Sequence, residues 1–237
     1  MDLKDIIWTK KSYQEFVNYL TSLEEIKYKK FMSKALVEEK NLIGIKTPKL
    51  KEIAKEISKG EWREFIKYSH NCYYEEGVIK GLILGFIKCD YKIRKDYLDS
   101  FIEEIDNWAV CDIVVGNLKF LKKEKEIYYD FVKECISSSD NWRIRFGLVI
   151  LLGYYLEERY IDEIFSFCSS ITNKEYYVKM AQAWLISMMF IKFREKTLDY
   201  LKENTLDNWI QNKAIQKIRE STRVSKEDKN FILIFKR

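Results

Sequence analysis

The tripeptide Asp-Asn-Trp occurs three times along the chain, at residues 106–108, 140–142 and 207–209. The first two copies are 34 residues apart, and the third lies 67 residues beyond the second, which is nearly two more periods. Tyr176 occupies the place of the missing copy, and Tyr74 lies one period before the first. An aromatic residue that opens an amphipathic segment therefore recurs at a fixed period, which indicates a repeat architecture.

The residues around each aromatic predict the start of a helix. An Asp or Asn side chain at the N-cap accepts hydrogen bonds from free backbone amides and places negative charge at the positive end of the helix dipole. A second helical pattern follows, over residues 127–136, 161–171 and 197–201. Two helices per repeat are typical of an α-solenoid, whose units bury their faces by stacking. We expect helices to begin near residues 107, 141, 175 and 208 and to stack side by side.

Few residues that break helices interrupt the chain, since 237 residues contain one proline and eight glycines. Sheets that face solvent need many turns, and turns are made from Gly, Pro, Asn and Asp. The sequence therefore predicts an all-α fold with about twelve to fourteen helices. Without a linker, we expect a single domain over residues 1–237, with repeats over 71–220 and less regular helices over 1–70.

Three helices are expected before the repeats, over residues 12–23, 26–36 and 48–58. The last of them has a clear start signal. Thr47 suits the N-cap, and Pro48 suits the first helical position because proline lacks the amide that would be unpaired there.

The rarity of histidine and the scatter of the cysteines limit the chemistry that the chain can perform. The five cysteines form no Cys-x-x-Cys pair, and His70 is the only histidine. Neither a zinc site nor a nucleophile paired with histidine is expected. Dispersed thiols indicate reduced cysteines in a reducing cytosol. No apolar run is long enough to span a membrane and the N-terminus lacks a signal-peptide pattern, so we expect a cytoplasmic protein without a membrane contact.

The positive charges fall on the leading helices of the repeats. The formal net charge of +5 favours an anionic partner. Positions related by the repeat period line up in a solenoid, and a basic stripe on a curved scaffold fits a phosphate backbone. The alternative is that these charges only solvate helix surfaces. The stripe comprises Arg143, Arg145, Lys179, Lys213, Lys217 and Arg219.

Asp112 stands alone among the apolar residues of segment 108–115. Aspartate is a poor helix former, and its burial between apolar residues is costly. Trp108 lies one turn before it and Gly116 one turn after it on the same face, which leaves space. A functional carboxylate is one interpretation, and an ion pair with a cation of the next repeat, such as Arg145, is the other.

Trp184 lies two turns into the segment that begins at Tyr176. A tryptophan on an apolar helix is most often a core residue. Its neighbours Ala181 and Ala183 are small, however, and would also permit the ring to project from the surface.

Five segments of the chain, in this order, resemble the AlkD family of bacterial DNA alkylation repair glycosylases. The resemblance covers nearly the whole sequence. The segments are Gly-Ile-Lys-Thr-Pro-Lys-Leu at 44–50, Asp-Asn-Trp-Ala-Val-Cys-Asp at 106–112, Trp-Arg-Ile-Arg-Phe at 142–146, Tyr-Val-Lys-Met-Ala-Gln-Ala-Trp at 177–184 and Gln-Lys-Ile-Arg-Glu-Ser at 216–221.

The resemblance implies a HEAT-like α-solenoid, or superhelix, whose concave basic groove holds duplex DNA. It implies a monofunctional glycosylase that hydrolyses the N-glycosidic bond of cationic alkylated purines, chiefly N3-alkyladenine and N7-alkylguanine, in base excision repair. The expected partner is double-stranded DNA that contains alkylated bases. We further expect a monomer without a cofactor, associated with the nucleoid in a bacterial cytoplasm.

The resemblance also implies roles for particular residues. It gives Trp108, Asp112 and Trp184 catalytic roles and gives Arg145 a contact with DNA. Tyr28, near the first lysine-rich helix, is a further candidate for DNA binding. Of the basic stripe, Arg143, Lys179 and Lys213 are expected to meet phosphates.

A second function from another class stays open at this point, namely a non-catalytic scaffold that binds DNA or a protein. Asp112 favours the enzyme, because a protein that only binds phosphates gains nothing from an acidic residue among them. A carboxylate near the anomeric carbon would stabilise the positive charge that develops as the base departs.

Overall fold

The computed structural model describes residues 2–36 and 41–237, and within them every regular element is helical. The described residues form fourteen α-helices, and their one β-type contact is an isolated bridge between Asn41 and Tyr73. The all-α prediction is therefore confirmed. The chain divides into two compact units, Met1–Lys123 and Glu124–Arg237, called unit 1 and unit 2 below. The single domain expected from the sequence stays a prediction.

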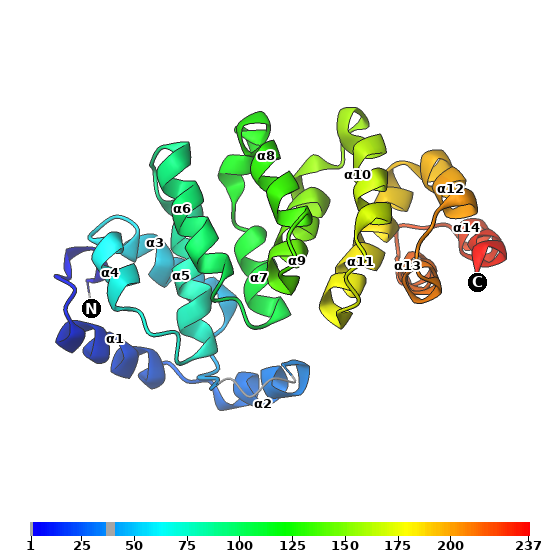
Figure 1. The fold of residues 1–237 in the computed structure, drawn as a ribbon. Coiled ribbons are helices and arrows are strands. Elements are labelled where there is room, and N and C mark those ends of the chain that lie inside the picture. The colour runs from blue at the N-terminus through cyan, green and yellow to red at the C-terminus, as the bar shows by residue number, and fades with distance from the viewer. Residues whose placement is uncertain (1, 37–40) are drawn as a thin grey trace. The chain divides into compact units, whose positions relative to one another are not determined.

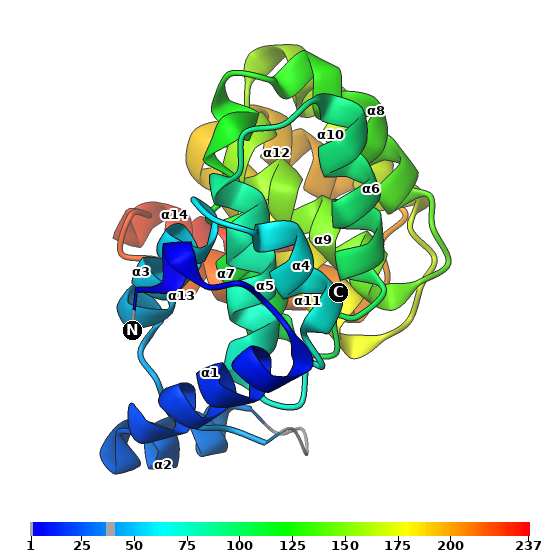
Figure 2. The same ribbon diagram turned by 90° about the vertical axis from the view of Figure 1, so that its left-hand side faces the viewer.

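Unit 1 contains seven α-helices in its described part (Figures 1 and 2). Helix α5 lies at its centre, where it packs against α3, α6 and α7. The helices are α1 (Lys10–Ser22), α2 (Ile26–Ala35), α3 (Thr47–Ile57), α4 (Trp62–Tyr68), α5 (Tyr74–Phe86), α6 (Tyr91–Ile102) and α7 (Trp108–Val115), with 3-10 turns η1 (Leu3–Asp5) and η2 (Lys119–Lys122).

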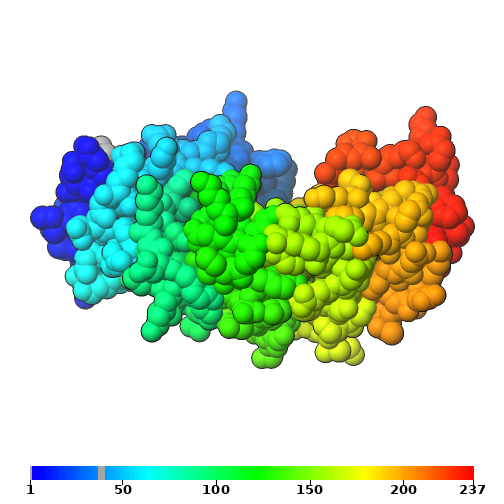
Figure 3. All heavy atoms as spheres, turned by 90° about the horizontal axis from the view of Figure 1, so that it is seen from above, coloured from blue at the N-terminus to red at the C-terminus, as the bar shows by residue number. Residues whose placement is uncertain are grey.

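Unit 2 contains seven more α-helices in a regular stack. Helix α8 packs on α9, α9 on α11, and α11 on both α12 and α13. In the space-filling view of Figure 3 the last residues, in red, lie against the helices before them, in orange. The helices are α8 (Lys125–Ile136), α9 (Asn141–Ile150), α10 (Glu158–Ser170), α11 (Tyr176–Lys192), α12 (Arg194–Glu203), α13 (Asn208–Glu220) and α14 (Lys226–Phe231), with a π-helical turn η3 (Leu151–Tyr155) and a 3-10 turn η4 (Ile232–Phe235).

The repeat signature places helix starts correctly. Helices α7, α9, α11 and α13 begin at residues 108, 141, 176 and 208, within one residue of the expected positions. Asn107 accepts hydrogen bonds from the amides of Ala109 and Val110, at 3.1 and 3.0 Å. Asp140 and Asp207 cap α9 and α13 in the same way. The Asp-Asn-Trp pattern therefore works locally, because its polar residues satisfy amides that a helix start leaves free.

The expected cap of α3 is wrong by one residue. Thr47 is the first helical residue, Lys46 occupies the N-cap, and Pro48 follows inside the first turn. No side chain caps this helix. Proline is tolerated there because amides of the first turn have no partner within the helix.

A buried carboxylate of α5 fixes the segment before α3. Glu75, with 0% of its surface exposed, accepts hydrogen bonds from the amides of Ile43, Gly44 and Ile45 at 3.0, 2.6 and 3.2 Å. Gly44 has φ +101°, and a Cβ there would lie 2.7 Å from Cβ of Lys29 in α2. The Gly-x-x-Thr-Pro segment thus needs glycine for its backbone conformation and for close contact with α2.

The described cysteines form no disulfide, and Cys111, Cys135 and Cys168 are buried in helices, in keeping with the expected packing. Burial raises the pKa of the Cys168 thiol to about 12. Among the described helices, none is long and apolar enough to cross a membrane.

Candidate functional site

Helix α7 is buried except along one narrow face. Ala109, Val110, Cys111, Val114 and Val115 are buried, as the apolar sequence of the helix requires. Asp112 is partly exposed, as are Trp108 one turn before it and the neighbouring Ile113, and Gly116 one turn later is exposed. Spacings of four residues place Trp108, Asp112 and Gly116 on one face.

This face presents a carboxylate beside an indole ring with no side chain at Gly116 to cover them. Asp112 is therefore available to solvent and is not a residue of the unit 1 core. An accessible acid on an apolar helix can stabilise positive charge in a bound molecule.

Tyr28 lies in the other exposed part of unit 1 that the sequence singles out. Its ring stacks on Phe31 with centroids 6.5 Å apart and an interplanar angle of 28°. Phe31 is 67% exposed, and lysines at 27, 29, 30 and 34 share the helix. Helix α2 therefore exposes aromatic rings among positive charges, a combination that suits nucleic acid.

In unit 2 the leading aromatics of successive repeats are joined into one row of ring contacts with the help of Tyr177. We call Trp142, Tyr177, Tyr176 and Trp209 the aromatic row. Trp142 stacks on Tyr177 at a centroid distance of 5.2 Å, Tyr177 meets the edge of Tyr176 at 5.3 Å, and Tyr176 meets Trp209 at 5.9 Å. Tyr176 is 55% exposed, and the other three rings are partly exposed. The row thus forms a continuous accessible edge at the starts of α9, α11 and α13.

Two residues of the predicted basic stripe lie on this row. Arg145 is only 3% exposed, its Nη1 donates a 2.8 Å hydrogen bond to the carbonyl of Tyr177, and its guanidinium lies 5.9 Å from the centre of that ring. Lys179 lies 4.8 Å from the centre of the Trp209 ring, and its Nζ is 3.2 Å from a carboxylate oxygen of Asp207. Each cation stands three residues after the leading aromatic of its own repeat, and it contacts an aromatic ring at the start of the next repeat, Tyr177 for Arg145 and Trp209 for Lys179.

Two pKa shifts report on the charge around the row. The hydrogen bond from Lys179 lowers the pKa of Asp207, so this cap stays ionised. The pKa of Lys217 is lowered by burial and, to a smaller extent, by the nearby charges of Lys213 and Arg145. Positive charges are therefore gathered here at an electrostatic cost, which an anion bound beside them would offset.

Trp184 belongs to the accessible face of α11. It is partly exposed, as are Tyr177, Met180 and Met188 at helical spacing, while its neighbours Ala181 and Ala183 are buried. The small neighbours thus leave the Trp184 ring at the surface of the helix. Trp184 is placed to contact a molecule that covers this face.

The remaining stripe residues are more accessible than Arg145. Arg143 is partly exposed in the first turn of α9. Lys213 donates a 2.7 Å hydrogen bond to Gln216 and lies 5.5 Å from the centre of the Trp209 ring. Unit 2 therefore brings Arg145, Lys179 and Lys213 together along the aromatic row.

Sequence reasoning identified the aromatics as helix starts and missed that they bind the cations of the preceding repeat. The signal was present, because each cation follows its aromatic by three residues, but the contact joins different repeats. Sequence reasoning also gave no role to Tyr177. Within the part of the chain that the structure describes, no group of His, Cys, Asp and Glu could hold a metal ion.

A family model described as "DNA alkylation repair enzyme" matches residues 16–218, which is most of the chain. No curated protein matches the sequence.

Proposed function

Because the chain belongs to the DNA alkylation repair enzyme family, we propose that it is a monofunctional glycosylase that removes cationic alkylated purines from duplex DNA. The substrates are N3-alkyladenine and N7-alkylguanine, and the reaction belongs to base excision repair. The observation that carries the proposal is the accessible carboxylate of Asp112 beside Trp108 on an otherwise buried apolar helix.

In this reaction the bond between C1′ of the deoxyribose and the purine nitrogen breaks, and the base leaves with the bonding electrons. The positive charge of the alkylated base is neutralised as it leaves, so the departing base needs no proton. C1′ becomes oxocarbenium-like, and the Asp112 carboxylate stabilises that charge and orients the attacking water. Water supplies hydroxide to C1′, and its remaining proton passes to solvent.

The aromatic candidates act on the cationic nucleotide. The π faces of Trp108 and Trp184 each contribute about 0.5–2 kcal/mol of attraction to a nearby positive charge. Both rings are partly exposed, which such contact requires. Tyr28 contributes a further ring from α2.

The duplex is held by the cations of unit 2. Arg143, Lys179 and Lys213 are partly exposed and available to phosphates. Arg145 is buried and adds its positive charge behind these three residues, while its Nη1 donates a hydrogen bond to the Tyr177 carbonyl. Affinity for undamaged duplex should fall with a log–log salt slope of about −0.9 per phosphate neutralised.

The test is release of methylated purines from alkylated duplex under single-turnover conditions. Asp112→Asn keeps the size of the side chain and removes its charge, so excision should slow about 10²- to 10³-fold. Binding to undamaged duplex should be retained or become tighter, because one negative charge near the phosphates is gone. Asp96→Asn, an exposed carboxylate of α6, is the matched control and should keep the wild-type rate.

One result would reject the enzyme, and another would reject the catalytic role of Asp112. Wild-type protein that binds duplex and releases no base would support the non-catalytic scaffold. An Asp112→Asn variant with normal excision and a lower melting temperature would show that this carboxylate is structural.

A further inference from the structure

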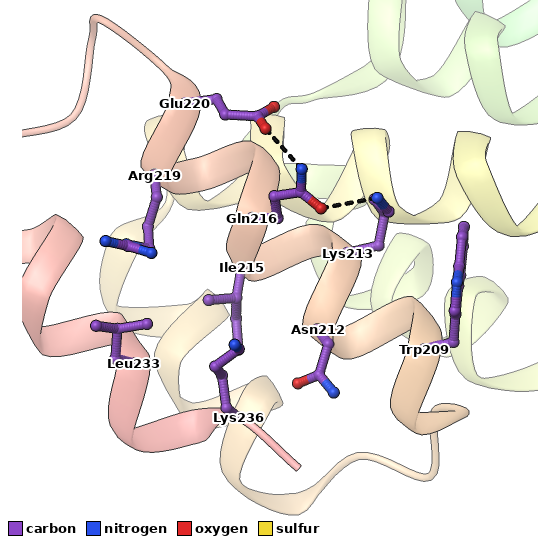
Figure 4. A pocket seen from close by; sticks show the side chains of 9 residues that line it. All are labelled: Trp209, Asn212, Lys213, Ile215, Gln216, Arg219, Glu220, Leu233 and Lys236. Carbon is purple, nitrogen blue, oxygen red and sulfur yellow. Dashed lines mark hydrogen bonds between the residues drawn. The ribbon is translucent and has the colours of Figure 1, made fainter.

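A hollow of about 580 Å³ lies over α13 and the residues that follow α14 (Figure 4). We call it the α13 hollow. Figure 4 shows the chain Lys213–Gln216–Glu220 along one side of α13, with Arg219, Leu233 and Lys236 on the other. The hollow is lined by Trp209, Asn212, Lys213, Ile215, Gln216, Arg219, Glu220, Leu233 and Lys236.

The wall of the hollow opposite α13 is held in place. Gln211, which is 1% exposed, donates a 2.6 Å hydrogen bond from Nε2 to the backbone oxygen of Phe235. Asn212 accepts from the amide of Arg237 at 3.1 Å and donates to its backbone oxygen at 2.5 Å. The guanidinium of Arg237 donates to the carbonyls of Leu206 and Asn204. The segment that carries Leu233 and Lys236 is therefore docked on α13 and forms a built surface.

The charges in the hollow are mostly positive and mostly unpaired. Lys213, Arg219 and Lys236 face one acid, Glu220, which accepts a 2.7 Å hydrogen bond from the Gln216 amide. Arg219 donates from Nε to the carbonyl of Lys229 at 3.2 Å. Within residues 2–36 and 41–237, its two Nη groups and the Nζ of Lys236 have no hydrogen-bond or ion-pair partner. The hollow thus offers donors to an anion.

The hollow continues the aromatic row. Trp209 ends the row and also lines the hollow, and Lys213 lies against the same ring. Lys217, one turn after Lys213 on α13, carries the lowered pKa that burial and the charges of Lys213 and Arg145 produce. Positive charge therefore runs from α9 along α13 into the hollow.

From this continuity we propose that the α13 hollow binds backbone phosphates of the duplex outside the segment held by the aromatic row. The proposal rests on the proposed function, since it takes duplex DNA as the ligand. Lys213 and Arg219 are six residues apart, about 9 Å along a helix, and charges spread in this way suit a chain of phosphates better than one small anion. Trp209 and Leu233, which are partly exposed, supply apolar surface against which deoxyribose can pack.

The experiment measures binding of wild-type protein and variants to an undamaged duplex over a series of salt concentrations. Arg219→Gln/Lys236→Gln removes the two cations whose donors are free. The salt slope should become shallower by about 0.9 for each phosphate that the variant no longer neutralises. Lys133→Gln/Lys202→Gln removes the same charge from exposed positions on α8 and α12 and should leave the slope unchanged.

The outcomes separate this proposal from the one it rests on. Wild-type protein without salt-dependent duplex binding would reject the proposed function and the hollow together. Wild-type binding with equal slopes for the two double variants would reject the hollow alone. Duplex binding that is unchanged while binding to poly-glutamate disappears would assign the hollow to an acidic protein and also overturn the proposal.

Discussion

Carboxylates of α5 in unit 1 and cations of α9 and α11 in unit 2 join neighbouring segments of the chain through contacts of opposite charge. In unit 1 two buried carboxylates of α5 make such contacts, since Glu75 accepts from three backbone amides and Glu76 accepts from the hydroxyl of Tyr13 and the amide of Tyr73. In unit 2 the corresponding contacts come from cations, with Arg145 on the Tyr177 carbonyl and Lys179 on Trp209 and Asp207.

This difference shows whether the residues that stabilise each unit are also the residues that can bind a ligand. Glu75 and Glu76 are sealed from solvent and cannot meet a ligand, whereas Asp112 on α7 is partly exposed and can. In unit 2 the same cations that join repeats also lie on the accessible aromatic row, where an anion can reach Lys179 and Lys213. Substitutions should therefore separate stability from binding in unit 1 and affect both in unit 2.

The largest effect on stability is expected at Glu75. Glu75→Ala leaves the amides of Ile43, Gly44 and Ile45 without their acceptor, which should lower the free energy of unfolding by about 3 kcal/mol or more. Urea unfolding measures the loss. Glu52→Ala, an exposed acid of α3, should change stability by less than about 0.5 kcal/mol. A decrease below about 1 kcal/mol for Glu75→Ala would show that water replaces the carboxylate at little cost.

The next largest effect on stability is expected at Arg145. It tests whether the cations of unit 2 both join repeats and support DNA binding. Arg145→Gln removes a charged hydrogen bond to the Tyr177 carbonyl, so unfolding should become easier by about 2 kcal/mol. Duplex affinity should fall equally for all sequences, because the charge that Arg145 places behind the phosphate-binding cations carries no sequence information. Fluorescence binding assays on two unrelated duplexes, together with urea unfolding, follow both properties. Weaker binding at full stability would mean that Arg145 does not join the repeats.

The smallest effect is a pH dependence confined to unit 2. The pKa of Asp207 is lowered by Lys179, so the pair contributes stability above the ordinary aspartate pKa and loses it as the pH falls through the lowered value. Lys179→Met should therefore destabilise the protein at about pH 7, by less than about 1 kcal/mol because the pair is partly exposed, and hardly at all near pH 3. An equal difference at both pH values would assign the contribution of Lys179 to the Trp209 ring alone.

The helices could be predicted from sequence because their start signals are local. The Asp-Asn-Trp copies place caps within the same turn that they stabilise, so α7, α9 and α13 begin where expected. Thr47 is not the cap, because proline is tolerated at either of the first two helical positions. The helix therefore begins at Thr47, and Lys46 occupies the N-cap.

The candidate site was predictable as a set of residue types and less so as a set of contacts. Asp112 stood out because an acid inside an apolar helix has a local cost, and its exposure agrees with that reasoning. The partners of Arg145 and Lys179 are 32 and 28 residues away, at the Tyr177 carbonyl and at Asp207. Such contacts depend on how one repeat packs on the next, which a periodic pattern does not specify. Glu75 escaped notice for the same reason, since its amide partners precede it by about thirty residues.

The contacts along the aromatic row bear on how such a chain can be recombined. The pair Arg145 and Tyr177 and the pair Lys179 and Trp209 each straddle the boundary between two sequence repeats. A chimera joined in the loop before α11 or before α13 would separate one pair and leave a cation facing a ring from another parent. A junction between Tyr177 and Lys179, inside α11, would separate neither. The segment of unit 2 that can be exchanged without separating a pair is therefore offset from the helix pair. Chimeras joined in loops should fold best when both parent proteins carry the same residues at both positions of each pair.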